Sequence, residues 1–288
     1  MLTVMITCFN QEDIIGKTID SLLNQKTNVD FKILISDDLS KDNSMTVLKA
    51  YESKYSNIKV VQPKEKFYVG HNRNTLFQNV DTEYCLFIDG DDVQEEDYLD
   101  PILQEINSSK KDIYRIKNFE ETWSDRKIIK DSLNYSNFML FVYKTDYIKG
   151  LLVNPTLRIG EDVEFEFRNY KLLHKETNII DTCYALNRRD DNESLTKNGD
   201  IKSRYELELK LYNIIKNYED IDPYVKSMVN RKKVELINFA TLIDEKPLAF
   251  NVKIKNIGNR YLACFIMYKI FPRSLFKYVL VKKIGKKF

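Results

Sequence analysis

The sequence predicts an α/β fold built on a mixed, mainly parallel sheet flanked by helices, with a C-terminal helical extension. Strand-like apolar segments alternate with amphipathic helical segments four times within residues 1–110, which is typical of a parallel sheet covered by helices. Two of these strands end in paired aspartates. In open α/β sheets, ligands bind beyond the carboxyl ends of the strands, so we expect a ligand site there.

The first strand, Leu2 to Thr7, is a continuous apolar run of the kind that is buried on both faces of a parallel sheet. A helix is expected from Asp13 to Asn24, where apolar residues recur at helical spacing. The other elements expected in this half are strands at 31–36, 58–61 and 84–88, and helices at 44–55, 70–79 and 95–107.

After residue 110 the pattern is more mixed. We expect strands at 113–119 and 179–186, an extended aromatic segment at 138–143 and a helix at 163–173. Segment 120–131 is polar, and we assign no element to it. Residues 202–243 favour helix, broken at Asp222-Pro223 because proline interrupts the helical hydrogen bonds. We therefore divide the chain into two halves of one α/β domain (1–110 and 111–200), a helical extension (201–246) and a tail (247–288).

Composition places the chain among ordinary globular proteins, since 43% of its 288 residues are hydrophobic and 31% are charged. The four cysteines lack CxxC spacing, which indicates free thiols in a reducing compartment. The two histidines leave little material for a His-based zinc site or a Ser-His-Asp triad. We find no signal-peptide pattern and no apolar run of about 20 residues, and we expect a cytoplasmic protein.

Three aspartates, Asp89, Asp91 and Asp92, follow the fourth strand, and Asp37 and Asp38 follow the second. Like charges within about 6 Å repel each other, so a cluster of this density favours a bound divalent cation. Carboxylate oxygens suit Mg²⁺ or Mn²⁺. The alternative is an acidic turn that caps the next helix. Both clusters should face one crevice at the carboxyl edge of the sheet.

Four motifs in chain order closely resemble those of the family 2 glycosyltransferases, over about residues 1–196. They are Ile6-Thr7-Cys8-Phe9-Asn10, Ser36-Asp37-Asp38-x-Ser40-x-Asp42, Phe87-Ile88-Asp89-Gly90-Asp91-Asp92 and Gly160-Glu161-Asp162. The resemblance implies the GT-A fold, a nucleotide-sugar donor and a divalent cofactor, Mn²⁺ or Mg²⁺.

The resemblance also implies roles for residues that bind the donor. Thr7 and Phe9 would line the base pocket, with Phe9 stacked on uracil. Asp38 would accept a hydrogen bond from the uracil N3–H, which favours UDP over GDP. Asp91 would bind the metal that bridges the diphosphate, with Asp89 near the ribose or the metal.

Further roles follow from the other motifs. Asp162 matches the general base of the inverting members, with Glu161 beside it in the catalytic pair. Arg73 would lie near the donor, and Arg189 or its neighbour Arg188 would belong to a loop that closes over the site. Each assignment has a structural alternative: a turn residue (Asp37, Ser40, Asp42), a helix cap (Asp92, Asp162) or a solvated helix residue (Arg73).

Elementary chemistry agrees with these roles. Breaking the bond between the anomeric carbon and a phosphate oxygen leaves negative charge on the diphosphate, which a bound metal neutralises. The attacking hydroxyl loses a proton, which a nearby carboxylate can accept. A helix N-terminus would lower the pKa of Asp162, whereas burial or the adjacent Glu161 would raise it.

The tail differs chemically from the rest of the chain. Residues 247–288 contain ten Lys and Arg and no Asp or Glu, so the first 246 residues carry a net charge of −8 within the chain's total of +2. Apolar and aromatic residues alternate with lysines, which predicts an amphipathic segment on an anionic membrane surface. The alternatives are a helix pair packed on the body, a homodimer interface, and nucleic-acid binding, which no motif supports.

Together, the resemblance and the chemistry imply an inverting hexosyl- or N-acetylhexosaminyltransferase. It would move a sugar from a UDP-sugar to a hydroxyl of a glycan acceptor, expected to be lipid-linked, at the inner face of a bacterial cell membrane during surface polysaccharide synthesis. One rival is a nucleotidyltransferase, which needs a Gly-rich phosphate loop that residues 7–12 lack. The other is a catalytically silent membrane-associated scaffold, against which the intact Asp38, Asp91 and Asp162 count.

Overall fold

The computed structural model describes residues 1–123, 126–131, 137–174, 177–187 and 201–242. The chain divides into two compact units. The first comprises Met1–Glu166 and Leu172–Asp190, and the second comprises Phe167–Lys171 and Asp191–Phe288.

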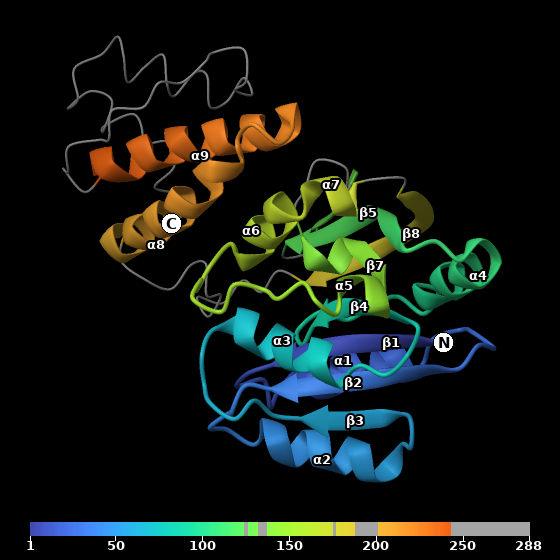
Figure 1. Ribbon diagram of the computed structural model, residues 1–288. Helices are drawn as coiled ribbons and strands as arrows, with labels where there is room; N and C mark the ends of the chain where they lie inside the picture. Colours follow the sequence, from blue (N-terminus) through green and yellow to red (C-terminus); the bar gives the residue numbers. More distant parts are fainter. Residues whose placement is uncertain (124–125, 132–136, 175–176, 188–200, 243–288) are drawn as a thin grey trace. The chain divides into compact units, whose positions relative to one another are not determined.

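One mixed sheet of eight strands organises the described part of the first unit (Figure 1). The strands are β1 (Leu2–Cys8), β2 (Phe31–Asp37), β3 (Ile58–Val61), β4 (Tyr84–Asp89), β5 (Ile113–Trp123), β6 (Arg126–Asp131), β7 (Phe141–Lys144) and β8 (Asn178–Asn187). Their order is β3-β2-β1-β4-β7-β5-β6, with β8 also paired to β5. The pairs β1–β2, β2–β3, β1–β4 and β5–β8 are parallel, which confirms the predicted mixed, mainly parallel sheet.

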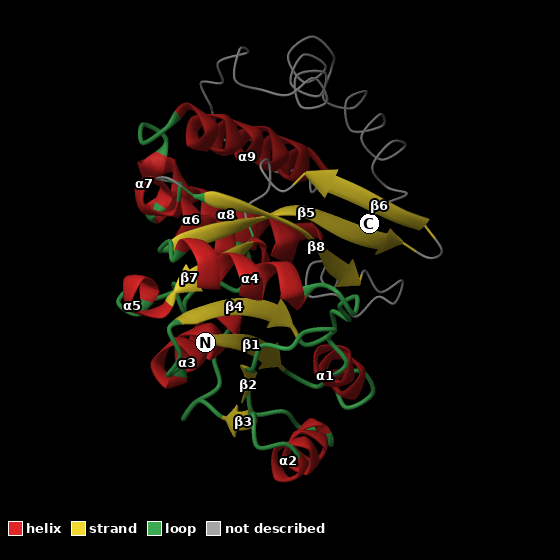
Figure 2. Ribbon diagram, turned by 90° about the vertical axis from the view of Figure 1, so that its right-hand side faces the viewer, coloured by secondary structure: helices red, strands yellow, loops and turns green. Residues whose placement is uncertain are grey.

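Helices α1 (Ile15–Leu23), α2 (Ser44–Lys54) and α3 (Val69–Asn79) cover both faces of the parallel half of this sheet. The helices that follow are α4 (Leu99–Ser109), which packs on β8, α5 (Thr145–Ile148), which packs on β7, α6 (Glu161–Arg168) and α7 (Tyr170–Leu173). Helix α3 lies on one face of β1–β3, and α1 and α2 lie on the opposite face (Figure 2). This cover explains why every residue of β1 is buried.

The strand register brings the expected site residues to one edge. Thr7 near the end of β1 pairs with Ser36 of β2 on one side and with Asp89 of β4 on the other. The sequence order reverses here, because β2 and β3 extend the sheet in one direction and β4 extends it in the other. Such a switch point is where α/β sheets bind ligands.

The second half of the sheet differs from the expectation in three places. The polar segment 120–131, to which no element was assigned, contributes the end of β5 and strand β6. β6 is an edge strand, where polar residues are tolerated and apolar alternation is weak. The aromatic segment begins with a 3₁₀ turn, Phe138–Leu140, before β7, and the expected helix 163–173 is two helices, α6 and α7.

In the second unit the described residues form the helices α8 (Ile201–Ile215) and α9 (Pro223–Leu242), with a 3₁₀ turn at Lys216–Tyr218. The predicted break at Asp222-Pro223 is confirmed. Asp222 Oδ1 accepts a hydrogen bond from the Tyr224 amide at 2.7 Å, and Pro223 is the first helical residue. No helix of the described residues is long and apolar enough to cross a membrane. The basic tail, 247–288, lies outside the described residues.

Candidate active site

A tight turn after β4 holds the first carboxylates of the site. The Gly90 amide donates a hydrogen bond to the Thr7 carbonyl at 3.2 Å, and the Thr7 hydroxyl lies 3.5 Å from Asp89 Oδ1. A Cβ atom at position 90 would lie 2.6 Å from the Thr7 carbonyl oxygen and 2.2 Å from Gln11 Oε1. Only glycine therefore lets the turn between Asp89 and Asp91 approach the end of β1 so closely.

Asp37 has a structural role at the end of β2. Its buried carboxylate accepts hydrogen bonds from the Ser40 amide at 3.0 Å, from the Ser40 hydroxyl, and from Gln62 Nε2 at 3.0 Å. These contacts build the turn that follows β2, so the turn-residue alternative describes Asp37.

Asp38, the next residue, is 6% exposed, and its Oδ1 atom is buried without a hydrogen-bond partner. Burial raises the pKa of its carboxyl to about 6, although Lys66 and His71 act in the opposite direction. Buried polar atoms are nearly always paired in native structures. An unpaired acceptor at the switch point is consistent with a ligand that donates a hydrogen bond.

Phe9 lies in the loop after β1 and is half-buried. The Lys66 ammonium lies over its ring, 3.2 Å from the centroid. The loop is held by Asn10, whose amide donates to Ser40 Oγ at 2.9 Å and whose Oδ1 accepts from the Lys41 amide at 2.9 Å. The Phe9 ring is therefore placed on a tethered loop beside the turn that carries Asp38, with one face open enough to receive a cation.

Arg73 of α3 connects three elements of the site. Its guanidinium donates to Glu161 of α6, lies 3.4 Å from Asp89 Oδ1 of β4, and packs 4.8 Å from the Phe138 ring centroid. Burial disfavours the charged form of Arg73, but Glu161, Asp89 and Asp162 outweigh it and hold its pKa above the ordinary value. Arg73 is 5% exposed, so its reading as a solvated helix residue is wrong.

Asp162 lies in the first turn of α6, where the Val163 amide donates to its Oδ1 at 2.8 Å. Burial raises the pKa of Asp162 to about 7, the charge of Glu161 adds to this, and Arg73 opposes it. Burial and Glu161 thus outweigh the helix N-terminus. A carboxylate with a pKa near neutrality is suited to accept a proton at physiological pH. Gly160, with φ 68°, supplies the turn into this helix.

Asp92 is buried and accepts a hydrogen bond from the Tyr184 hydroxyl of β8, which in turn accepts one from the Asp89 amide at 3.3 Å. Asp92 therefore anchors the end of β4 to β8. Asp91 is half-buried. Burial, then the charge of Asp37 and, more weakly, that of Asp91 raise the pKa of the Cys8 thiol to about 12. The Asp91 carboxylate therefore lies near the end of β1.

Asp89 and Asp91 offer the carboxylate oxygens that a hard divalent cation prefers. Within the described residues, no three His, Cys, Asp or Glu side chains converge on one metal position. Mg²⁺ is commonly held by one or two carboxylates, with substrate phosphates and water completing its coordination. The donor set suits a metal that is shared with a diphosphate.

Two asparagines of α3 that sequence reasoning missed hold the site together. Asn72 exchanges hydrogen bonds with Ser36 of β2, donating to its carbonyl at 2.9 Å and accepting from its hydroxyl. Asn74 donates to the Val153 carbonyl at 2.9 Å and accepts from its amide at 2.8 Å. The sequence feature that could have indicated their role is the unbroken run of four polar residues, 71–74, at the start of the predicted helix 70–79. Arg188 and Arg189 lie outside the described residues.

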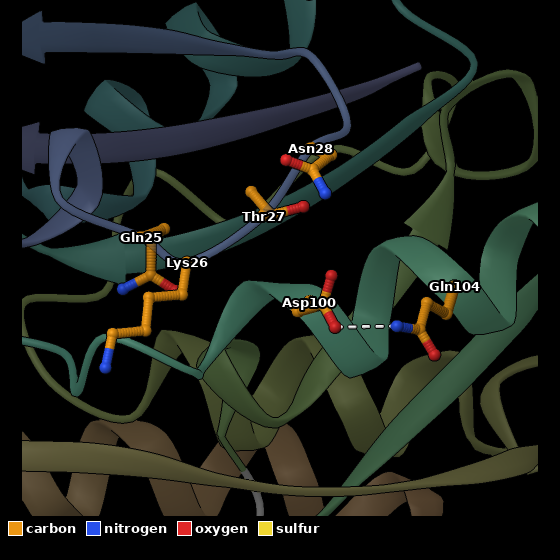
Figure 3. Close-up of a pocket in the computed structure, with 6 residues that line it drawn as sticks. All are labelled: Gln25, Lys26, Thr27, Asn28, Asp100 and Gln104. Atoms are coloured by element: carbon orange, nitrogen blue, oxygen red, sulfur yellow. Dashed lines mark hydrogen bonds between the residues drawn. The ribbon is translucent and has the colours of Figure 1, made fainter.

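A polar hollow of about 460 Å³ lies between the turn after α1 and helix α4 (Figure 3). It is lined by Gln25, Lys26, Thr27, Asn28, Asp100 and Gln104. The turn leads into the amino end of β2, so the hollow lies at the opposite edge of the sheet from the carboxylates. Along α4, Gln104 Nε2 donates to Asp100 Oδ2 at 2.6 Å.

Comparison with known proteins finds relatives that are mostly longer. Poly(ribitol-phosphate) beta-glucosyltransferase of Bacillus spizizenii is 26% identical over 214 residues, which cover 68% of this chain and 33% of that protein. Glycosyltransferase GlyA of Streptococcus pneumoniae is 28% identical over 210 residues, 64% of this chain and 30% of that protein. The chain thus spans about a third of the length of these relatives.

Among solved structures, Staphylococcus aureus TarS 1–349 in complex with UDP-GlcNAc matches with a TM-score of 0.60 and 20% identity, covering 99% of this chain and 88% of that chain. Mannosyltransferase PcManGT from Pyrobaculum calidifontis, in complex with GDP-Man and Mn²⁺, matches with a TM-score of 0.59 and 13% identity, covering 100% and 88%. These likenesses confirm the GT-A fold. The model of glycosyl transferase family 2 matches residues 3–196, and the chain therefore belongs to this family.

Proposed function

We propose that the protein is an inverting glycosyltransferase that moves a sugar from a UDP-sugar to a hydroxyl of a cell-envelope glycan. The observation that carries this proposal is Asp162, a carboxylate with a pKa of about 7 next to Glu161, whose partner Arg73 reaches Asp89 at the strand ends. A proton acceptor is thereby connected to the edge of the sheet where the donor would bind.

On the donor side, Phe9 would stack on the base, with Thr7 lining the pocket and Asp38 accepting the uracil N3–H. Asp91, with Asp89 nearby, would hold Mn²⁺ or Mg²⁺ on the diphosphate. When bound, this metal neutralises the charge that develops on the leaving group. The unpaired Oδ1 of Asp38 supports this arrangement, as do UDP-GlcNAc in the TarS structure and Mn²⁺ in that of the mannosyltransferase.

The reaction is a single displacement. The acceptor oxygen forms a bond to the anomeric carbon from the face opposite the diphosphate, and the bond from that carbon to the phosphate oxygen breaks with its electron pair on UDP. Asp162 takes the hydroxyl proton. Arg73 keeps Glu161 in place. Burial, together with the charge of Glu161, keeps the pKa of Asp162 raised. Retaining hydrolases, in contrast, use a carboxylate nucleophile and two steps.

The acceptor is proposed from the relatives, which include a poly(ribitol-phosphate) beta-glucosyltransferase and a teichoic acid poly(glycerol phosphate) polymerase. We propose a surface polymer, lipid-linked during its synthesis, at the inner face of the cell membrane. The basic tail, 247–288, would provide contact with anionic lipid or a homodimer interface. Sedimentation of the full chain with anionic vesicles, compared with a chain ending at residue 246, tests the lipid contact.

Calorimetry and product analysis test the proposal. UDP-glucose and UDP-GlcNAc should bind in the presence of Mn²⁺, GDP-mannose should bind more weakly, and Asp91→Ala should remove the metal dependence. Turnover should release UDP and a product of inverted anomeric configuration. Release of pyrophosphate would indicate a nucleotidyltransferase instead, and a retained configuration would exclude the single displacement.

A further inference from the structure

A second unpaired polar atom lies near Asp38. His71 Nδ1 is buried and has no hydrogen-bond partner, as is true of Asp38 Oδ1. The two residues are close enough for His71 to oppose the rise in the pKa of Asp38, yet neither unpaired atom bonds to the other. Because unpaired buried atoms are rare, a nitrogen and an oxygen left open together point to one ligand that pairs with both.

The packing of α3 on β2 places these two residues together. Asn72 exchanges hydrogen bonds with Ser36, so His71, which precedes Asn72, is brought to the strand end that continues into Asp38. The His71 amide donates to the Tyr68 carbonyl at 2.8 Å. The imidazole ring is packed edge-on against Phe67, with 5.0 Å between the ring centroids. The backbone hydrogen bond and the ring contact with Phe67 together fix the position of the imidazole.

The hydrogen-bonding edges of the bases distinguish what such a pair would recognise. Uracil presents one donor, N3–H, flanked by two carbonyl acceptors, so its recognition needs an acceptor next to a donor. Guanine presents two adjacent donors, N1–H and the exocyclic amine, which match the two oxygens of a single carboxylate. An imidazole donor next to Asp38 therefore favours uracil.

We propose that His71 donates a hydrogen bond through Nδ1 to a uracil carbonyl next to N3, while Asp38 accepts the N3–H, so that His71 determines the preference for uridine over guanosine donors. This inference rests on the proposed UDP-sugar function and adds to it a residue that reads the base.

Lys66 is the competing donor. Its ammonium lies 3.2 Å from the centroid of the Phe9 ring, on a ring face where a stacked base would lie. A base bound on that face would displace the exposed Lys66 side chain. His71 is the stronger candidate because its free nitrogen is already buried.

Two variants separate the hydrogen bond from packing. His71→Leu removes the donor, and His71→Asn keeps an amide N–H close to the position of Nδ1. By calorimetry on the full chain with Mn²⁺, His71→Leu should bind UDP about tenfold more weakly, as expected for one lost hydrogen bond. Its affinity for GDP should not fall, and His71→Asn should retain most of the affinity for UDP.

Thio-substituted UDP tests the hydrogen bond itself. If His71 had only a structural role, replacing it would not change the loss of affinity caused by the sulfur. Sulfur accepts hydrogen bonds poorly, so 4-thio-UDP or 2-thio-UDP should bind more weakly than UDP to the wild-type protein. That penalty should disappear in His71→Leu, as in a double-mutant cycle.

Three results would overturn the inference: no thio penalty in the wild type, an equal penalty in His71→Leu, or a penalty removed by Lys66→Ala instead. A wild-type protein that binds no UDP at all would refute the proposed donor, which distinguishes the two failures.

Discussion

Glu208 of α8 and Asp38 at the end of β2 are carboxylates with 3% and 6% exposure. Glu208 accepts hydrogen bonds from Arg204 Nη2 at 2.7 Å and from Lys232 Nζ at 2.8 Å, whereas Asp38 keeps an oxygen without a partner. Burial acts on both carboxylates to raise the pKa. Lys232 and Arg204 outweigh it and lower the pKa of Glu208, while that of Asp38 rises to about 6.

The difference shows how buried charge serves two purposes in one chain. In the helix pair, the buried charge of Glu208 is matched by Arg204 of α8 and Lys232 of α9. Lys232 is also paired with Glu235 at 2.7 Å. Asp38 after β2 and Asp162 at the start of α6 stay under-compensated, which costs stability and leaves them reactive towards a ligand or a proton. Neutralising Glu208 and neutralising Asp38 should therefore have opposite effects on stability.

The largest effect is expected for Asp162→Asn. The amide cannot accept the acceptor's proton, so kcat should fall by about 10² to 10⁴, while calorimetric binding of UDP with Mn²⁺ is unchanged. In the wild type, kcat should fall about tenfold per pH unit below the pKa of about 7, because only the ionised carboxylate is a base. Asp146→Asn, at an exposed position of α5, is the control, and comparable turnover in the two variants would remove Asp162 as the base.

Glu208→Gln should reduce the free energy of unfolding by about 3 kcal/mol, because it removes the counter-charge of Arg204 and leaves Lys232 paired with Glu235 alone. The pKa of Glu208 is lowered in the folded state, so its contribution is present above the ordinary value of 4.5 and is lost as the pH falls through the folded-state pKa. Urea unfolding at pH 7 and in acid would measure this. Glu206→Gln, an exposed position on the same helix, should have little effect, and equal losses for the two variants would contradict the comparison.

Asp38→Asn should increase stability by about 1–3 kcal/mol at pH 7.5 and weaken UDP binding. Because the folded-state pKa is raised from 3.8 to about 6, the folded protein binds more protons in that window, and stability falls as the pH rises through it. The gain should therefore vanish near pH 4. Asp37→Asn is the matched control and should destabilise, since the Asp37 carboxylate accepts three hydrogen bonds. A stabilised Asp37→Asn would show that the two positions are not distinct.

Much of the parallel half of the sheet could be predicted from local pattern. The apolar runs 2–7, 31–36 and 84–88 form β1, β2 and β4 to within one residue, because a strand buried on both faces must be apolar throughout. The hairpin β5–β6 was missed because an edge strand bears no such requirement. No site role for His71 could be predicted from the sequence, because the sequence does not show which residues lie around a single histidine.

The sequence by itself determined that carboxylates follow the second and fourth strands and that a glycine separates Asp89 from Asp91. Both features are visible in motifs a few residues long. Only the tertiary structure decided which carboxylate of each pair is hydrogen-bonded within the protein and which keeps an unpaired oxygen. Asp37 is satisfied by Gln62 from beyond α2, Asp92 by Tyr184 of β8, and Glu161 by Arg73, 88 residues away. Desolvation and long-range pairing set the chemistry of a charge, and both arise only when distant segments pack together.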